Sequence, residues 1–183
     1  VSVSGIHHER QSYQLCGLHS VNALLQAEGE DADAAEMDSI ADEILETSVA
    51  AGVLPCHVGM WPACCIRSCC HPHRGPFGNY DVNVLTTALE RRGCIVEWYD
   101  KRGRARGIPY DDPSLMGFLC NGVNRFYMLT SGRHWFAVRR IKGRWFNLDS
   151  LVDRPKPFPE TAAVRDALQA VFDDDGEVLL VKR

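Results

Sequence analysis

The sequence predicts an α+β fold in which N-terminal helices pack on a mostly antiparallel sheet. Apolar residues recur at helical spacing in the first half of the chain, and strand-like apolar runs bounded by turn residues fill much of the second half. The 183 residues are 45% hydrophobic and 24% charged, and no linker or internal repeat interrupts them. We therefore expect a single domain over residues 1–183.

The first half carries three helical patterns, and the second and third have a polar residue at the start that can cap the free N–H groups. The apolar faces of the first two helices are Leu18, Val21, Leu24 and Leu25, then Met37, Ile40, Ala41, Ile44 and Leu45. The expected bounds are residues 16–28 for the first helix, a start after Asp31 or Asp33 for the second, and a start at Asn79 or Asp81 for the third, with Gly93 beyond its end.

The second half alternates short strands with two helices. Runs rich in β-branched and aromatic residues favour strands, and an apolar stripe that ends at Phe172 favours a helix. The expected strands are residues 94–99, 126–129, 134–141, 144–148 and 177–181, and the expected helices are residues 114–120 and 160–172.

Residues 51–77 lose all periodicity and form an irregular, cysteine-rich insert. Thiolates and imidazoles there could bind zinc, but the neighbouring cysteines lack the two-residue gap usual between paired ligands. We therefore expect no metal and no cofactor, and interpret the segment as a flexible insert or as intron-derived sequence. It holds five of the eight cysteines, which are Cys56, Cys64, Cys65, Cys69 and Cys70.

Charge and hydropathy exclude several classes of protein. The net charge of −4 and the pI near 6.0 argue against a general nucleic-acid binder, and the basic run at residues 101–106 is interpreted as a solvated loop. No apolar stretch is long enough to span a bilayer, and no secretory signal is recognisable. We expect free thiols in a reducing compartment, the cytoplasm, with the nucleus as a second location.

Cys16 stands where a polar, turn-like approach enters the first helix. The N–H groups and partial positive charge at a helix N-terminus favour thiolate, and the amide of Gln11 could stabilise an oxyanion. Two readings are open at this point: Cys16 is a nucleophile, or it is a small buried core residue.

A predicted hairpin supplies the rest of a catalytic set. If Lys142 and Gly143 form its turn, His134 and Asp149 share one face as diagonal neighbours, within hydrogen-bonding reach. Asn147 lies on the same face one pair further away, so Asp149 is the better orienting residue, although a one-residue slip would reverse its face. Such a pair is the base and orienter of a Cys-His-Asp triad, or an ordinary ion pair at a strand end.

Four segments of the sequence form a recognisable set. They are Gln11-x4-Cys16-x2-His19-x2-Asn22, Gly78–Val84, His134-Trp135 and Phe146–Ser150. Together they resemble the Josephin family of papain-like deubiquitinating cysteine proteases, and within it the small single-domain members. The resemblance runs from about Ile6 to the end, with a gap at about residues 50–70. It implies a papain-like fold, with the nucleophile on an N-terminal helix and the base on a later strand.

Carried over to this sequence, the resemblance implies Cys16 as nucleophile, His134 as general base and acid, and Asp149 as orienter. Gln11 would contribute to the oxyanion hole. His19 and Asn147 would support these groups without taking part in the chemistry.

The implied partners are ubiquitin and ubiquitinated proteins, and the implied bond is an isopeptide at the ubiquitin C-terminus, with an ester as a second accessible bond. Two alternatives remain. One is a ubiquitin-binding module whose catalysis is weak or lost because the insert disturbs the cleft. The other is a metal-binding regulatory domain built on the cysteine-rich segment.

Overall fold

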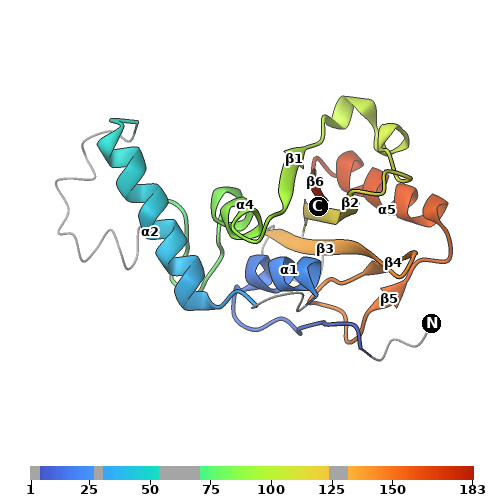
Figure 1. The fold of residues 1–183 in the computed structure, drawn as a ribbon, viewed down its shortest axis with the longest axis horizontal. Coiled ribbons are helices and arrows are strands. Elements are labelled where there is room, and N and C mark those ends of the chain that lie inside the picture. The colour runs from blue at the N-terminus through green and yellow to red at the C-terminus, as the bar shows by residue number, and fades with distance from the viewer. Residues whose placement is uncertain (1–4, 27–30, 54–70, 124–131) are drawn as a thin grey trace.

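A computed structural model describes residues 5–26, 31–53, 71–123 and 132–183 (Figure 1). The predicted α+β class is confirmed in these residues, whereas the extent of the domain stays a prediction. The elements, in chain order, are α1 (Cys16–Leu25), α2 (Ala34–Ala50), α4 (Val82–Glu90), β1 (Ile95–Trp98), η2 (Lys101–Gly103), η3 (Ala105–Gly107), β2 (Leu115–Val123), β3 (Arg133–Ile141), β4 (Arg144–Asn147), β5 (Lys156–Pro157), α5 (Thr161–Asp173) and β6 (Glu177–Lys182).

The sheet has the strand order β1-β6-β2-β3-β4-β5, and every pair of neighbouring strands is antiparallel. The helix expected over residues 114–120 is wrong, because this stretch is the central strand β2. Its apolar run is buried without alternation, since Leu115, Phe118 and Leu119 are all covered by helices on the two faces of the sheet. Periodicity alone does not separate such a strand from a buried helix. The strand expected at residues 126–129 lies outside the described residues.

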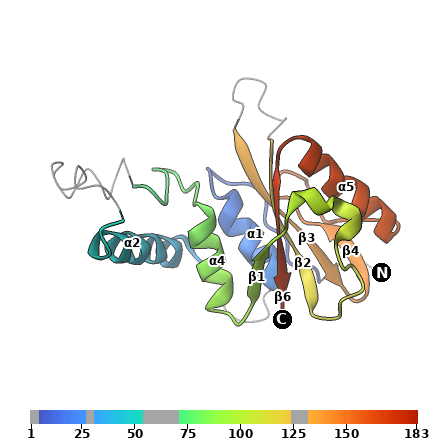
Figure 2. The ribbon, with the colours of Figure 1, turned by 90° about the horizontal axis from the view of Figure 1, so that it is seen from above.

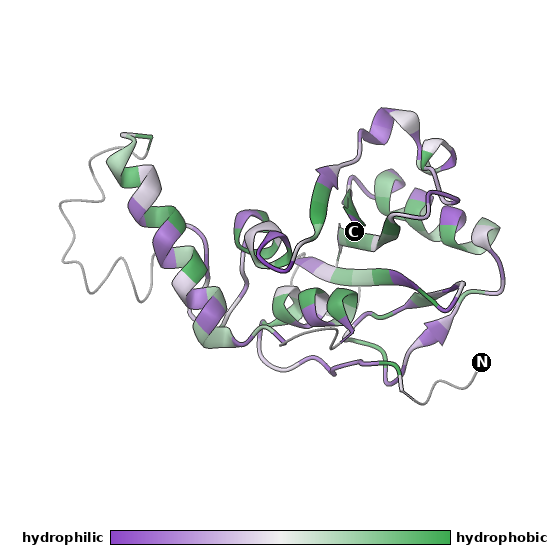
Figure 3. Ribbon diagram, in the orientation of Figure 1, coloured by the Kyte–Doolittle hydropathy of each residue, from purple (hydrophilic) through white to green (hydrophobic). Residues whose placement is uncertain are grey.

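Helices cover both faces of the sheet. Figure 2 shows α1 and α4 on one side of it and α5 on the other. One apolar cluster joins α1 and α4 to residues such as Trp135 and Phe146, and a second joins α5 to Phe118 and Trp145. The apolar residues are concentrated in α1 and the strands, while polar and apolar residues alternate along α2 (Figure 3). None of the helices in the described segments is both long and apolar enough to cross a membrane.

The helix starts follow the predicted caps. Asp33 caps α2, where its carboxylate accepts the Glu36 N–H at 2.8 Å, and Asp81 caps α4 in the same way. Helix α1 ends at Leu25 rather than at residue 28, because Gln26 adopts a left-handed conformation with φ 57°. Figure 1 shows α2 leaning away from the sheet, with α4 between them.

The β3–β4 hairpin has the predicted turn and register. Lys142 and Gly143 both have positive φ, at 49° and 79°, as a two-residue type I′ turn requires. Ile141 pairs with Arg144, and Val138 pairs with Asn147. Strand β4 ends at Asn147, so Asp149 lies in the loop that follows it. The hairpin thereby places the end of β4 beside the middle of β3, and the loop after β4 brings Asp149 to His134 near the start of β3.

The basic run at residues 101–106 forms two short 3-10 turns rather than an open loop. Lys101 pairs with Asp175 and Glu177, and Arg102 pairs with Asp100. These basic side chains are therefore engaged by acidic neighbours of the same chain.

Candidate active site

Cys16 is the first residue of α1, and its side chain is only 6% exposed. The first N–H groups of a helix have no partner within the helix and carry a partial positive charge. The Cys16 carbonyl is fixed by the Ser20 hydroxyl, which donates to it at 2.7 Å. The thiol therefore occupies a position that stabilises negative charge on sulfur.

His134 and Asp149 are brought together as the hairpin predicts. The imidazole Nε2 lies 2.7 Å from Asp149 Oδ1, and the ring is buried against Phe136 with their planes 15° apart. The same Oδ1 also accepts the Leu151 N–H at 2.9 Å, which fixes the carboxylate. Asn147 does not contact the imidazole; its Oδ1 accepts the Asp149 N–H at 2.9 Å and so fixes the loop backbone.

Cys16 completes a hydrogen-bonded row of three side chains, because its thiol contacts the His134 imidazole. Asp149 takes the hydrogen bond at Nε2, so Nδ1 is the ring nitrogen that is left for the sulfur of Cys16. Burial of His134 disfavours its charged form, but the hydrogen bonds to Asp149 and Cys16 outweigh burial and raise the pKa of His134 to about 9. The geometry suits an imidazolium that stabilises a thiolate.

This raised pKa predicts a loss of stability at alkaline pH. The contribution of protonated His134 to the free energy of unfolding is fully present below the ordinary histidine pKa of about 6.5. It is lost as the pH rises through about 9, because between these values only the folded state holds the proton. We expect the free energy of unfolding to fall by an amount of order 3 kcal/mol between pH 7 and pH 10. Urea unfolding at both pH values measures it. His134→Gln should show a clearly smaller fall, and an equal fall would contradict the assignment.

Gln11 is held beside the same loop. Its N–H donates to the Ser150 carbonyl at 2.8 Å, and its side-chain Oε1 accepts the Ser150 hydroxyl at 2.7 Å. Its Nε2 donates to the Tyr13 carbonyl at 2.8 Å, which leaves one amide proton for another acceptor. Its assignment to an oxyanion hole stays a prediction.

His19 is buried one turn along α1 from Cys16, and it contacts Glu9 and Ser12 rather than the triad. His19 is among the supporting residues expected from the sequence, whereas Glu9, Ser12 and Ser150 are not. The spacing of Glu9 from His19 carries no helical or strand signal, because the two residues lie on different segments. Ser150 could have been found as the neighbour of Asp149.

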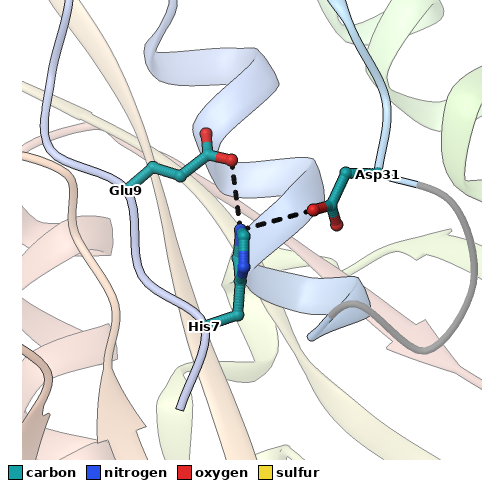
Figure 4. Close-up of side chains that lie close together, drawn as sticks. All are labelled: His7, Glu9 and Asp31. Atoms are coloured by element: carbon teal, nitrogen blue, oxygen red, sulfur yellow. Dashed lines mark hydrogen bonds and ion pairs between the residues drawn. The ribbon is translucent and has the colours of Figure 1, made fainter. Parts of the chain in front are cut away.

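Only one group in the described residues has donors near enough to hold a metal ion. His7 Nε2, Glu9 Oε1 and Asp31 Oδ2 lie within 4.8 Å of one another (Figure 4). His7 already pairs with both carboxylates, with its Nε2 3.1 Å from Glu9 and 3.9 Å from Asp31. The cysteines of the insert lie outside the described residues, so the expected absence of a metal site there stays a prediction. Cys16, Cys94 and Cys120 are free thiols.

An open groove of about 600 Å³ lies near the start of β3. One wall contains Trp135, Asn121 and Arg133 from the ends of β2 and β3, and the other contains residues from the segment 71–82. Asn121 pairs with Trp135 in the sheet, which explains why these wall residues lie together. Cys16, His134 and Asp149 do not line this groove, although His134 is the sequence neighbour of Arg133 and Trp135.

A family model described as Josephin matches residues 11–182. The chain is 42% identical to a Josephin-like protein of Arabidopsis thaliana over 91% of this chain and 44% of that protein. It is 30% identical to Josephin-2 of Homo sapiens, over 96% of this chain and 85% of that protein. It is 27% identical to human ataxin-3, over 87% of this chain and 40% of that protein. The chain thus spans less than half the length of the Arabidopsis and ataxin-3 relatives.

Proposed function

This chain belongs to the Josephin family, and we propose that it is a thiol-dependent deubiquitinase that cleaves bonds at the ubiquitin C-terminus. The observation that carries the proposal is the hydrogen-bonded row of Cys16, His134 and Asp149. A thiol at a helix N-terminus, a buried imidazole and an orienting carboxylate are the parts that nucleophilic acyl transfer requires.

The chemistry has two halves. The Cys16 thiolate attacks the carbonyl carbon of the terminal glycine, and the carbonyl oxygen becomes an oxyanion near Gln11 and the N–H of Cys16. His134 Nδ1 donates its proton to the lysine nitrogen, so the C–N bond breaks and a thioester remains. His134 then takes a proton from water, which attacks the thioester, and the carboxylate and the free thiolate are released.

The depth of the thiol favours a substrate that ends in glycine. Cys16 is only 6% exposed, so an acyl donor with no side chain beside the scissile carbonyl reaches the sulfur with the least steric conflict. Ubiquitin ends in glycine. An isopeptide to lysine is the proposed bond, and an ester to a hydroxyl would pass through the same thioester.

A ubiquitin that carries a C-terminal electrophile tests the proposal. We expect one covalent adduct, mapped by peptide mass spectrometry to Cys16, and much slower labelling of His134→Ala. The control is an unrelated protein with the same electrophile, which should not react. An adduct on another cysteine, or equal labelling by the control protein, would overturn the proposal.

A ubiquitin-binding module without turnover is the second candidate. One observation favours it: the Gln11 amide already donates to the Tyr13 carbonyl, which withdraws one donor from a developing oxyanion. This candidate predicts noncovalent binding of ubiquitin with no adduct and no hydrolysis.

A further inference from the structure

Residues 6–12, here called the N-terminal strap, run between α1 and the loop that carries Asp149. Some of its residues contact that loop: His8 Nε2 lies 3.0 Å from the Asp149 carbonyl, and Gln11 is paired with Ser150. Others turn towards α1, where Glu9 contacts His19 and Asn22. The strap therefore links the start of the helix that carries the thiol to the loop that carries the orienting acid.

The carboxylate of Glu9 is held from three sides. Its Oε2 contacts His19 Nδ1, while its Oε1 accepts the Asn22 amide at 3.2 Å and lies 3.1 Å from His7 Nε2. Figure 4 shows His7 standing between Glu9 and Asp31. The hydrogen bond from His19 lowers the pKa of Glu9 to about 2, with burial opposing it and Asn22 assisting. Glu9 is therefore an ionised acceptor with a fixed direction.

This carboxylate selects one tautomer of His19. An ionised carboxylate only accepts, so Nδ1 of His19 carries the proton, and Nε2 is left as an acceptor in the neutral ring. The Ser12 N–H points at Nε2 over 3.4 Å, and the Ser12 hydroxyl lies 3.2 Å from it. His19 is only 8% exposed, so water does not readily replace these contacts.

We propose that Glu9 and His19 act as a positioning pair that holds the backbone at Ser12, and through it the amide of the adjacent Gln11, at the oxyanion site. This inference rests on the proposed function. Glu9 and His19 act only through Ser12 and Gln11. At metal sites, a carboxylate that fixes the tautomer of a ligating histidine typically contributes about tenfold to a hundredfold in activity, and we expect an effect of the same order here.

Two reactions of Cys16 separate positioning from general disruption. Hydrolysis of a fluorogenic ubiquitin conjugate forms an oxyanion, whereas alkylation by iodoacetamide displaces iodide and forms none. For Glu9→Gln and His19→Ala we expect kcat to fall about tenfold to a hundredfold, KM to stay within about twofold, and alkylation of Cys16 to stay within about twofold. His19→Gln should recover part of kcat, because its amide oxygen can accept from Ser12.

The matched control is Arg10→Ala. Arg10 lies on the same strap, but it is exposed and pairs with Asp153, so its loss should leave both reactions unchanged. A parallel fall of hydrolysis and alkylation in Glu9→Gln, or no fall in either, would overturn the positioning role.

A measurement that needs no turnover keeps this inference distinct from the proposed function. The ¹⁵N shifts of the His19 ring in the wild-type protein should report a protonated Nδ1 and a bare Nε2, and Glu9→Gln should shift them. A protonated Nε2 in the wild type would overturn the positioning pair. A wild-type protein that has the expected tautomer and reacts with iodoacetamide, but hydrolyses no ubiquitin conjugate, would instead overturn the proposed function.

Discussion

Replacement of Cys16 by alanine is expected to abolish hydrolysis of ubiquitin conjugates, with a fall in kcat of about four orders of magnitude or more. The substitution removes the only atom proposed to form the acyl intermediate, and Cys16 is not among the residues that line the groove, so the groove is left unchanged. A fluorogenic ubiquitin conjugate measures turnover, and binding of unmodified ubiquitin should persist at wild-type affinity. The variant should also stay folded, because it loses one sulfur atom at a helix end.

Cys94→Ala is the matched control for this experiment. Cys94 is also buried and in no disulfide, but it precedes β1 and is not one of the three proposed catalytic residues, so its variant should retain turnover. Burial raises the pKa of Cys120, so that thiol is a poor nucleophile and does not substitute for Cys16. Turnover that survives in Cys16→Ala would rule out the proposed nucleophile.

The proximity of His134 and Asp149 could be predicted from sequence because a local signal fixes it. Lys142 and Gly143 suit a type I′ turn, and that turn sets the register of the whole hairpin. Counting back along β3 gives His134, and counting two residues past the end of β4 gives Asp149 in the loop. The sequence signal for a helix start at Cys16 is equally local, because a polar segment followed by an apolar stripe predicts it.

The remaining errors and omissions depend on tertiary contacts. The sequence predicts a helix where β2 lies, because burial on both faces removes the alternation that distinguishes a strand. The contacts of Glu9 with His19 and of Gln11 with Ser150 join segments that are far apart or irregular, and no periodic pattern announces them. These side chains come together only because the N-terminal strap packs against α1 and against the loop that carries Asp149.

The cysteine-rich insert raised the question of whether ubiquitin recognition is preserved. The segment that follows it is anchored to α2 by contacts of its own. Arg74 lies 2.7 Å from Asp38, and the Tyr80 hydroxyl donates to the same carboxylate at 2.9 Å. The part of the groove wall that residues 71–82 contribute is therefore held against α2 by described contacts.

The second large effect concerns the base. We expect His134→Ala to lower kcat/KM by about four orders of magnitude or more, because both proton transfers depend on the imidazole. Asp149→Asn should be milder, about tenfold to a hundredfold. The same oxygen, Oδ1, accepts from both Leu151 N–H and His134, so two donors would keep the amide oxygen of asparagine, rather than its NH₂, facing the imidazole. Steady-state kinetics of the two variants measure this difference.

The pH profile of kcat/KM distinguishes loss of the Asp149 charge from structural damage to the loop that carries it. Asparagine keeps the hydrogen bond but removes the charge, so the pKa of His134 should fall from about 9 and the alkaline limb of kcat/KM should move to lower pH. Asp153→Asn removes an exposed carboxylate four residues further on and should leave both rate and profile unchanged. Equal loss of activity in His134→Ala and Asp149→Asn would mean that the charge of Asp149 does more than orient the ring: an uncharged partner would then leave the imidazole unable to hold the proton that stabilises the Cys16 thiolate.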